Sequence, residues 1–343
     1  MDSFLDSLGA AFSSIHLSIF LIGFTSNTIL LSAAVLHTPA NLKSYSTLLK
    51  FGTVNDLICV FCDFINMQRI LVVPGNLLYI SYGPCTRISV RLCYLVHCLQ
   101  IGTIVYSYYV MLASFIFRLW ILLRPTPRSS TVFSIMIAIA IPPALVLMCI
   151  LLNIFAIMFH GWFTSAQADN GFVKRYIQVN APRYLNEKGA LSGNFGMTAQ
   201  LIITCIFTIA PVVPIYICII IVRQMKRKKT THTYCQILSN LSASMTNIST
   251  RNRNLHRILV KVVQFSKRGK IQQNNKALTI HACLPLLSSF AVLIYLIRLF
   301  DIYYHPSLEK AITTLASVPP ALGAFCSLYY IEPYRRYISF HYS

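Results

Sequence analysis

Charged side chains are scarce in this chain of 343 residues, where Asp, Glu, Lys and Arg together make up 11%. Soluble domains usually carry about 25% charged residues. Hydrophobic residues make up 56% of the chain, and the mean hydropathy is +0.62. This composition excludes an ordinary soluble domain and predicts a polytopic membrane protein with little mass outside the bilayer.

Acidic residues are the scarcest charged class: nine Asp and Glu stand against 29 Lys and Arg, for a net charge of +20. Such a balance could indicate nucleic-acid binding. Here, however, the basic residues lie in short segments between apolar runs, where they set membrane topology. We therefore expect no nucleic-acid partner.

Catalytic and metal-binding motifs are also missing. The chain has no HExxH, no GxSxG and no glycine run that could cradle a phosphate. Asp56 and Asp63 lie in one predicted helix, whereas an intramembrane aspartyl protease needs its two aspartates on separate helices. Cys59 and Cys62 form a CxxC inside an apolar run, without a second Cys or His pair to complete a metal site. We expect no enzyme activity, no metal and no cofactor.

The segment that orients the chain is 223–276, which holds thirteen Lys and Arg and no Asp or Glu between two apolar runs. Basic loops between membrane helices stay cytoplasmic. About 20 apolar residues are needed to cross a bilayer. We therefore predict one all-α domain over 1–343, a seven-transmembrane bundle with its amino terminus outside. The predicted helices are about 13–36, 44–67, 89–119, 131–159, 198–222, 277–300 and 310–331.

The charge census agrees with this topology, since the predicted inner segments hold nineteen Lys and Arg and the outer segments seven. Residues 68–88 are interpreted as an outer loop with Pro74-Gly75 and Gly83-Pro84 turns. The longest outer loop is predicted over 160–197. No internal repeat is present, which argues against a transporter built from paired repeats.

Five segments carry a resemblance that runs nearly end to end. They are HTPANLKSYSTLLKFGTVNDL (37–57), Gln68-Arg69 followed by YISYGPC (79–85), SFIFRLWILLRPTPR (114–128), ALTIHACLPLL (277–287) and IEPYRR (331–336). In this order they resemble the nematode seven-transmembrane chemoreceptors of the Srd class. The resemblance implies a GPCR-like fold and a chemosensory G-protein-coupled receptor in the plasma membrane of ciliated sensory neurons. Its implied partners are a small-molecule ligand, a heterotrimeric G protein and the lipid bilayer.

The sequence also allows two alternatives to the receptor function. A seven-span ligand-gated cation channel would have the reversed topology, which the charge census disfavours. An orphan membrane protein without signalling activity is the second alternative. The polar segment 262–276 bears on it, because this segment separates two stretches that are almost adjacent in the family. It is either a genuine insertion or an artefact of the gene model, such as a retained short intron.

Candidate signalling residues follow from similarity to rhodopsin-like receptors. Asn27 and Asp56 resemble their polar pair and are predicted to form a polar switch; the alternative is a structural hydrogen-bond anchor. Arg118 ends the third helix without a preceding acid, because residue 117 is Phe. Arg118, Arg335 and Arg336 are predicted to face the G protein, and the alternative is contact with lipid phosphates.

Candidate ligand-binding residues lie near the outer ends of helices three and six, because ligands of such bundles bind between the helices. They are Tyr94, His97, Gln100, Arg298 and Asp301, the last two spaced to pair on one face. The alternative is that the aromatic residues belong to the core and that Arg298 and Asp301 form a rim ion pair. Cys85 and Cys93 are outer cysteines without a partner in 160–197, so we expect no disulfide and an intact mass with eleven free thiols.

Overall fold

The computed structural model describes residues 2–73, 76–123, 126–141, 144, 170–180, 189–195, 210–222, 224–225, 283–284, 286–287, 289–298, 300, 302–303, 305–330 and 334–335. Long helices dominate these ranges. They are α1 (Asp2–Leu36), α2 (Lys43–Asn66), α3 (Val90–Leu123), α4 (Ser129–Ala138) and α11 (Pro306–Tyr330). Within this part of the chain, three stretches are long and apolar enough to cross a bilayer: Gly9–Leu36, Val90–Ile121 and Ser307–Tyr330. Shorter apolar helices cover Val212–Val222 and Ser289–Arg298.

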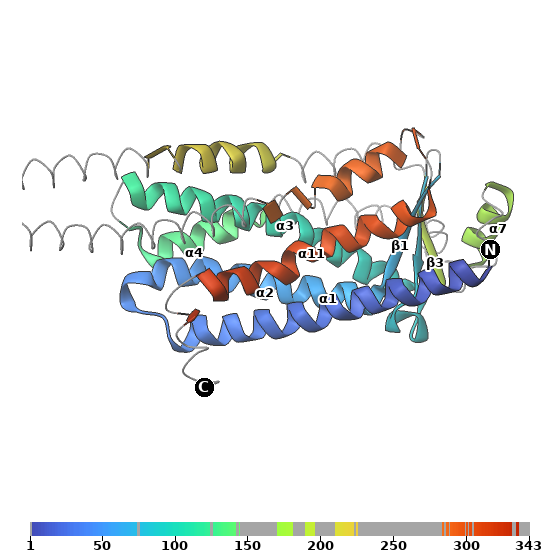
Figure 1. The fold of residues 1–343 in the computed structure, drawn as a ribbon, viewed down its shortest axis with the longest axis horizontal. Coiled ribbons are helices and arrows are strands. Elements are labelled where there is room, and N and C mark those ends of the chain that lie inside the picture. Colours follow the sequence, from blue (N-terminus) through green and yellow to red (C-terminus); the bar gives the residue numbers. More distant parts are fainter. Residues whose placement is uncertain are drawn as a thin grey trace, which may run out of the picture.

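The helices pack lengthwise into one elongated bundle (Figure 1). Helices α1, α3 and α11 begin at the end that carries a small β-sheet, which we call the sheet end. Helices α2 and α4 begin at the opposite end, which we call the far end. Helix α1 packs against α2 and α11, and α2 also packs against α3 and α4. Helices α1 and α11 therefore run in the same direction.

Close approach of α1 to its neighbours depends on a glycine. A Cβ atom added to Gly23 would lie 2.8 Å from Val60 Cγ1 and 3.0 Å from Ala321 Cβ. Beside it, Ser26 Oγ donates to the Ala321 carbonyl oxygen at 3.3 Å. Small residues at helix interfaces let backbones approach within a membrane. Gly23 thus lets α1 pack between α2 and α11.

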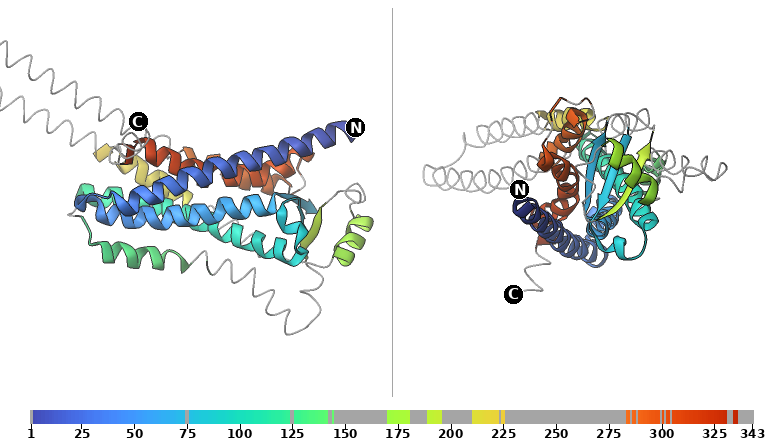
Figure 2. Two further views of the ribbon diagram at one scale, coloured as in Figure 1. Left: turned by 90° about the horizontal axis from the view of Figure 1, so that it is seen from below. Right: turned by 90° about the vertical axis from the view of Figure 1, so that its right-hand side faces the viewer.

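Three strands form an antiparallel sheet at the sheet end: β1 (Gln68–Val73), β2 (Asn76–Ser81) and β3 (Ala190–Phe195), in the order β1-β2-β3. The β1–β2 hairpin pairs Gln68 with Ser81 and Val73 with Asn76. Helix α7 (Asn170–Asn180) packs its buried Val173 and Ile177 on the sheet. The end-on view in Figure 2 shows the sheet and α7 in front of the bundle, as a cap over one end.

This sheet corrects the prediction of an all-α fold and of a loop over 68–88. Two runs rich in β-branched and aliphatic residues flank Pro74-Gly75, a pattern that indicates a hairpin. The loop prediction counts the same prolines and glycines only as loop signals. After β2 the chain forms a short 3-10 helix, η2 (Pro84–Arg87), which leads into α3. The predicted outer loop 160–197 likewise contributes α7 and β3.

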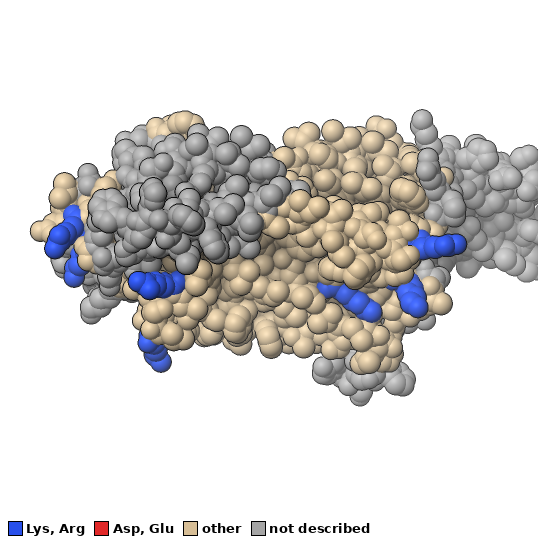
Figure 3. All heavy atoms as spheres, turned by 180° about the vertical axis from the view of Figure 1, so that it is seen from behind, with Lys and Arg blue, Asp and Glu red and all other residues tan. Residues whose placement is uncertain are grey.

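The surface matches a membrane-embedded bundle. In the view of Figure 3, Lys and Arg side chains lie toward the two ends, and an uncharged belt separates them. Many large hydrophobic side chains are exposed on the helices, among them Leu21, Ile22, Phe61 and Phe133. Exposed apolar patches of this extent mark contact with a partner or a membrane.

Several predicted segments lie outside the described residues in whole or in part. They are the later part of helix 131–159, the first half of helix 198–222, much of the first half of helix 277–300, and most of the basic loop 223–276. The segment 262–276 falls entirely within that loop. The predicted ranges 13–36, 44–67, 89–119 and 310–331 correspond to α1, α2, α3 and α11.

Candidate functional site

Four helices meet at Asp63, near the sheet end of α2. Its Oδ2 lies 2.6 Å from His16 Nδ1 on α1, and its Oδ1 accepts hydrogen bonds from Gln100 Nε2 on α3 at 2.9 Å and Ser317 Oγ on α11 at 2.6 Å. Asp63 is 1% exposed and His16 is fully buried. Thr314 Oγ1 lies 3.3 Å from the other ring nitrogen of His16. We call Asp63, His16, Gln100 and Ser317 the polar junction.

The polar junction supplies hydrogen-bond donors to a carboxylate whose burial inside the bundle would otherwise be unfavourable. Its partners come from three other helices, so the carboxylate fixes their relative positions. A helix that rotated or slid would leave at least one buried donor without an acceptor, a loss of about 1–3 kcal/mol. The junction can therefore transmit a displacement near the sheet end to all four helices.

A second charged cluster ties the sheet to the bundle. Arg69 on β1 donates to Glu309 Oε2 on α11 through Nε at 3.1 Å and Nη2 at 2.8 Å. Arg298 Nη2 lies 4.0 Å from the other oxygen of Glu309. All three side chains are at least 95% buried. This ion-pair cluster joins the hairpin, the helix Ser289–Arg298 and α11 at one point.

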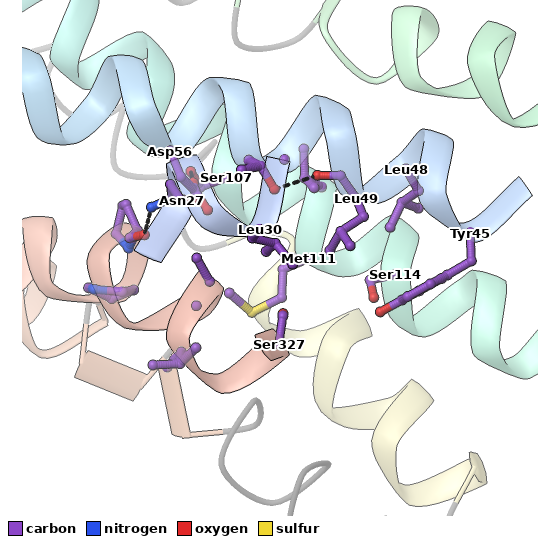
Figure 4. A pocket seen from close by; sticks show the side chains of 18 of the residues that line it. Asn27, Leu30, Tyr45, Leu48, Leu49, Asp56, Ser107, Met111, Ser114 and Ser327 are labelled. Atoms are coloured by element: carbon purple, nitrogen blue, oxygen red, sulfur yellow. Dashed lines mark hydrogen bonds between the residues drawn. The ribbon is translucent and has the colours of Figure 1, made fainter. Parts of the chain in front are cut away.

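A cavity of about 100 Å³ runs through the bundle from its middle toward the far end. Figure 4 shows Asn27 of α1, Asp56 of α2 and Ser107 of α3 gathered at one end of it. Ser107 Oγ donates to Asp56 Oδ1 at 2.9 Å. Asn27 Nδ2 donates to the carbonyl oxygens of Gly23 at 2.8 Å and Pro320 at 3.1 Å.

The amide oxygen of Asn27 has no hydrogen-bond partner among the described residues, although the side chain is fully buried. Asn27 and Asp56 both line the cavity, without a direct hydrogen bond between them in the part of the chain described. Asn27 instead anchors α1 to the backbone of α11, at a proline that removes a helix hydrogen bond. The arrangement leaves polar oxygens on the cavity wall.

Arg118 lines the opposite part of the same cavity. Its Nη2 donates to the hydroxyl oxygen of Tyr45 on α2 at 3.3 Å, and its guanidinium lies 5.5 Å from the Phe115 ring. Figure 4 places Tyr45 and Ser114 far along the cavity from Asp56. The polar pair and Arg118, which the sequence placed in separate helices, therefore share one cavity.

The predicted ligand-binding residues of α3 are all buried. Tyr94 and His97 lie against Tyr79 of β2, with ring centroids 6.4 and 4.0 Å away, and Gln100 belongs to the polar junction. Arg298 lies in the ion-pair cluster. Asp301 is outside the described residues, so the predicted Arg298–Asp301 pair is not seen.

The predicted tail contacts are only partly described. Tyr334 is fully buried and lies 3.3 Å from Thr38 Oγ1 through its hydroxyl oxygen, which holds this part of the tail against the far end of α1. Arg335 follows it and is half-buried, whereas Arg336 lies outside the described residues.

The expectation of eleven free thiols is wrong. Cys85 of η2 and Cys93 of α3 form a disulfide across eight residues of sequence. The prediction considered only a partner in 160–197, and it overlooked that the turn through η2 returns the chain toward the start of α3. Both cysteines pack with Ala190 of β3.

Sequence reasoning missed His16, Ser317 and the pairing of Arg69 with Glu309. His16 is a polar interruption of an apolar run, the same signal that identified Asn27. Arg69 and Glu309 fall in predicted outer segments, and nothing in their local sequence indicates a partner 240 residues away. No group of three His, Cys, Asp or Glu side chains that could hold a metal occurs among the described residues.

Comparison with known proteins gives one consistent result. The model of the family "Serpentine type 7TM GPCR chemoreceptor Srd" matches residues 12–339. The chain is 28% identical to serpentine receptor class delta-18 of Caenorhabditis elegans over 94% of this chain and 85% of that protein. It is 27% identical to serpentine receptor class delta-19, with the same coverage, and 24% identical to delta-3 over 92% and 82%, both from the same nematode.

Proposed function

The chain belongs to the serpentine chemoreceptor family Srd, and from this premise we propose that it senses a small molecule and signals to a heterotrimeric G protein. Membership makes it a multi-pass membrane receptor rather than a member of an enzyme family. The proposed topology has seven spans with the amino terminus and the sheet end outside. The parallel course of α1 and α11 fits an odd number of spans. The proposed site of action is the plasma membrane of ciliated sensory neurons.

The observation that carries the signalling proposal is the cavity that contains Asn27 and Asp56 at one end and Arg118 at the other. A cavity inside a helix bundle gives its walls room to move, whereas a close-packed core resists displacement. We assign Asn27 and Asp56 as the polar switch and Arg118 as the group that the switch releases toward the G protein. Arg335 and Arg336 would contribute to the same cytoplasmic surface.

The hydrogen bond from Arg118 to Tyr45 supplies the resting-state restraint in this proposal. No acid precedes Arg118, so a tyrosine on α2 takes the place of a carboxylate partner. A neutral acceptor holds an arginine less strongly than a carboxylate does. We therefore expect a resting state that small changes in packing can release.

The proposed ligand site lies at the sheet end, beside Tyr94, His97, Gln100, Arg298 and Asp301. Gln100 donates to Asp63, so a ligand that displaced α3 there would disturb the polar junction. From the junction the displacement would reach α1, α2 and α11, which also line the cavity. Two-state elements of this kind can couple distant sites.

The test uses the receptor's activity without added ligand and then a small-molecule screen, both with a G-protein activation reporter in cells. A surface tag normalises every signal to the amount of receptor at the plasma membrane. Arg118→Ala is expected to remove the signal at equal surface level, and Tyr45→Phe is expected to raise the ligand-independent signal. Lys43→Ala is the matched control, because this exposed basic residue lies at the same end of the bundle. Unchanged coupling in Arg118→Ala would refute the assigned role.

Asp56→Asn separates the switch from a structural anchor. A switch predicts normal surface level with altered signalling, whereas an anchor predicts loss of the protein from the surface. Tags on each terminus, stained before and after permeabilisation, test the proposed orientation. A reversed orientation would contradict the receptor topology and fit the channel alternative.

A further inference from the structure

An apolar groove lies between α3 and α4, on the outside of the bundle. Two contacts join α2 to the start of α4. Ser44 Oγ donates to the carbonyl oxygen of Pro127, just before α4, at 2.6 Å, and the hydroxyl oxygens of Thr47 and Ser129 are 2.7 Å apart. The Tyr106 hydroxyl on α3 donates to the Met136 carbonyl oxygen on α4 at 3.2 Å. A cavity of about 110 Å³ lies between the two helices.

Two facing stripes of side chains frame this groove. On α3 they recur at Tyr109, Leu112, Ile116 and Trp120. On α4 and its C-cap residue they recur at Thr131, Ile135 and Ile139. Such spacings of three and four residues keep each stripe on one helix face. Ala113, Phe117, Val132 and Met136 are buried beneath the groove, whereas Ile116, Trp120 and Ile135 are 46%, 38% and 43% exposed. The groove therefore has a packed floor and an open, outward-facing rim.

We infer that this groove binds one acyl chain of an anionic phospholipid from the surrounding bilayer. The chain belongs to a multi-pass membrane receptor family, so hydrocarbon chains are what an outward-facing apolar groove meets at this depth. The cavity of about 110 Å³ is smaller than the roughly 150 Å³ that accepts a benzene ring. That size suits a segment of a flexible chain rather than the fused rings of a sterol.

The charge at the mouth of the groove selects the headgroup. Exposed Arg128 lies between the lining residues Pro127 and Thr131, at the start of α4. A basic residue at the membrane surface attracts anionic lipids. The bound acyl chain fills the space between α3 and α4. It packs against the segment of α3 that also carries Arg118.

Trp120 provides a direct probe, because the chain has only two tryptophans and the other is Trp162. In a Trp162→Phe receptor, Trp120 is the sole indole. The receptor is placed in phosphatidylcholine nanodiscs that contain increasing fractions of a brominated lipid. This lipid is either phosphatidylserine or phosphatidylcholine, with bromine near the top of its acyl chain. Bromine quenches indole fluorescence on contact.

Quenching by brominated phosphatidylserine is expected to saturate at a low lipid fraction, with about fivefold preference over brominated phosphatidylcholine. Arg128→Gln should remove this preference, and Ile135→Phe should fill the groove and abolish saturation. The matched controls are Arg175→Gln on the exposed face of α7 and Ile22→Phe on α1, at a site 50% exposed. Both controls should behave like the parent.

Quenching that rises in proportion to lipid fraction and equally for both headgroups would mean bulk lipid contact only, and it would overturn the inference. Retained preference in Arg128→Gln, or unchanged saturation in Ile135→Phe, would do the same. If the Trp162→Phe receptor fails to fold, lipid that co-purifies with the wild-type chain is compared with that of the Ile135→Phe and Ile22→Phe receptors. Equal phosphatidylserine in all three would also overturn the inference. The outcome is independent of G-protein coupling, so it stands apart from the signalling proposal.

Discussion

Replacing Asp63 tests whether the polar junction holds the bundle together. Asp63→Ala removes the three hydrogen bonds that buried donors on three other helices make to this carboxylate. Each such bond inside a membrane protein contributes about 0.6–1.7 kcal/mol. The loss of stability is therefore expected to be about 2–5 kcal/mol, which lowers the unfolding midpoint by roughly 4–10 °C.

Asp63→Asn should cost less than half of this amount. The amide oxygen can take the place of Oδ1, which accepts from both Gln100 and Ser317. The amide nitrogen then faces His16 Nδ1, which can accept once it carries no proton. A much larger loss of stability in Asp63→Ala than in Asp63→Asn is specific to a junction in which one oxygen accepts from two donors.

The assay is thermal unfolding of the purified receptor, followed with a fluorophore that reacts with cysteines as they become exposed. Cys59, Cys62 and Cys98 are buried and free, so they report loss of the bundle. Val54→Ala is the control on the same helix, because this side chain is 44% exposed. The reasoning would be refuted if Asp63→Ala unfolded within one degree of the parent, or if the Asn variant were as unstable as the Ala variant.

Three further predictions concern other parts of the bundle. Arg69→Ala and Glu309→Gln should each cost about 3–5 kcal/mol, since each removes the hydrogen-bonded partner of a buried charge. The double variant should cost less than the sum, and additive midpoint shifts would contradict direct pairing. Gly23→Ala should lower stability by about 1–3 kcal/mol through overpacking. Gly9→Ala should not, because no atom lies within 4 Å of a Cβ added there. Equal unfolding midpoints for the two variants would contradict the close approach of α1 to α2 and α11. Alkylation of the denatured, unreduced chain should leave both cysteines of the disulfide described above unmodified, and mass spectrometry that finds them alkylated would exclude the bridge.

The polar junction shows how far local sequence signals reach. Asp63 is recognisable in the sequence as a carboxylate within an apolar helix, and such residues almost always face the interior of a bundle. Its partners were not recognisable, because His16 lies 47 residues away and Ser317 254 residues away. Hydropathy identifies which side chains are inside a helix bundle, but which of them meet depends on the rotation and height of each helix.

The sheet illustrates a different kind of error. The sequence signals for the β1–β2 hairpin are present in 68–81, since two aliphatic runs flank a Pro-Gly pair. The prediction of a loop gives these signals too little weight in a chain dominated by membrane helices. The third strand offers a weaker signal, because Ala190–Phe195 contains glycine and polar residues and pairs with β2 only through tertiary contact.

The amino-acid sequence by itself determined the membrane character of this protein and its receptor family. Both depend on properties that sum along the chain, namely apolar run length, scarcity of charge and the order of short motifs. Only the tertiary structure decided that Asp63 joins four helices, that Arg69 pairs with Glu309 and that Asp56 shares a cavity with Arg118. Those pairings depend on contacts between residues far apart in sequence, and helix packing fixes such contacts only after the whole bundle has assembled.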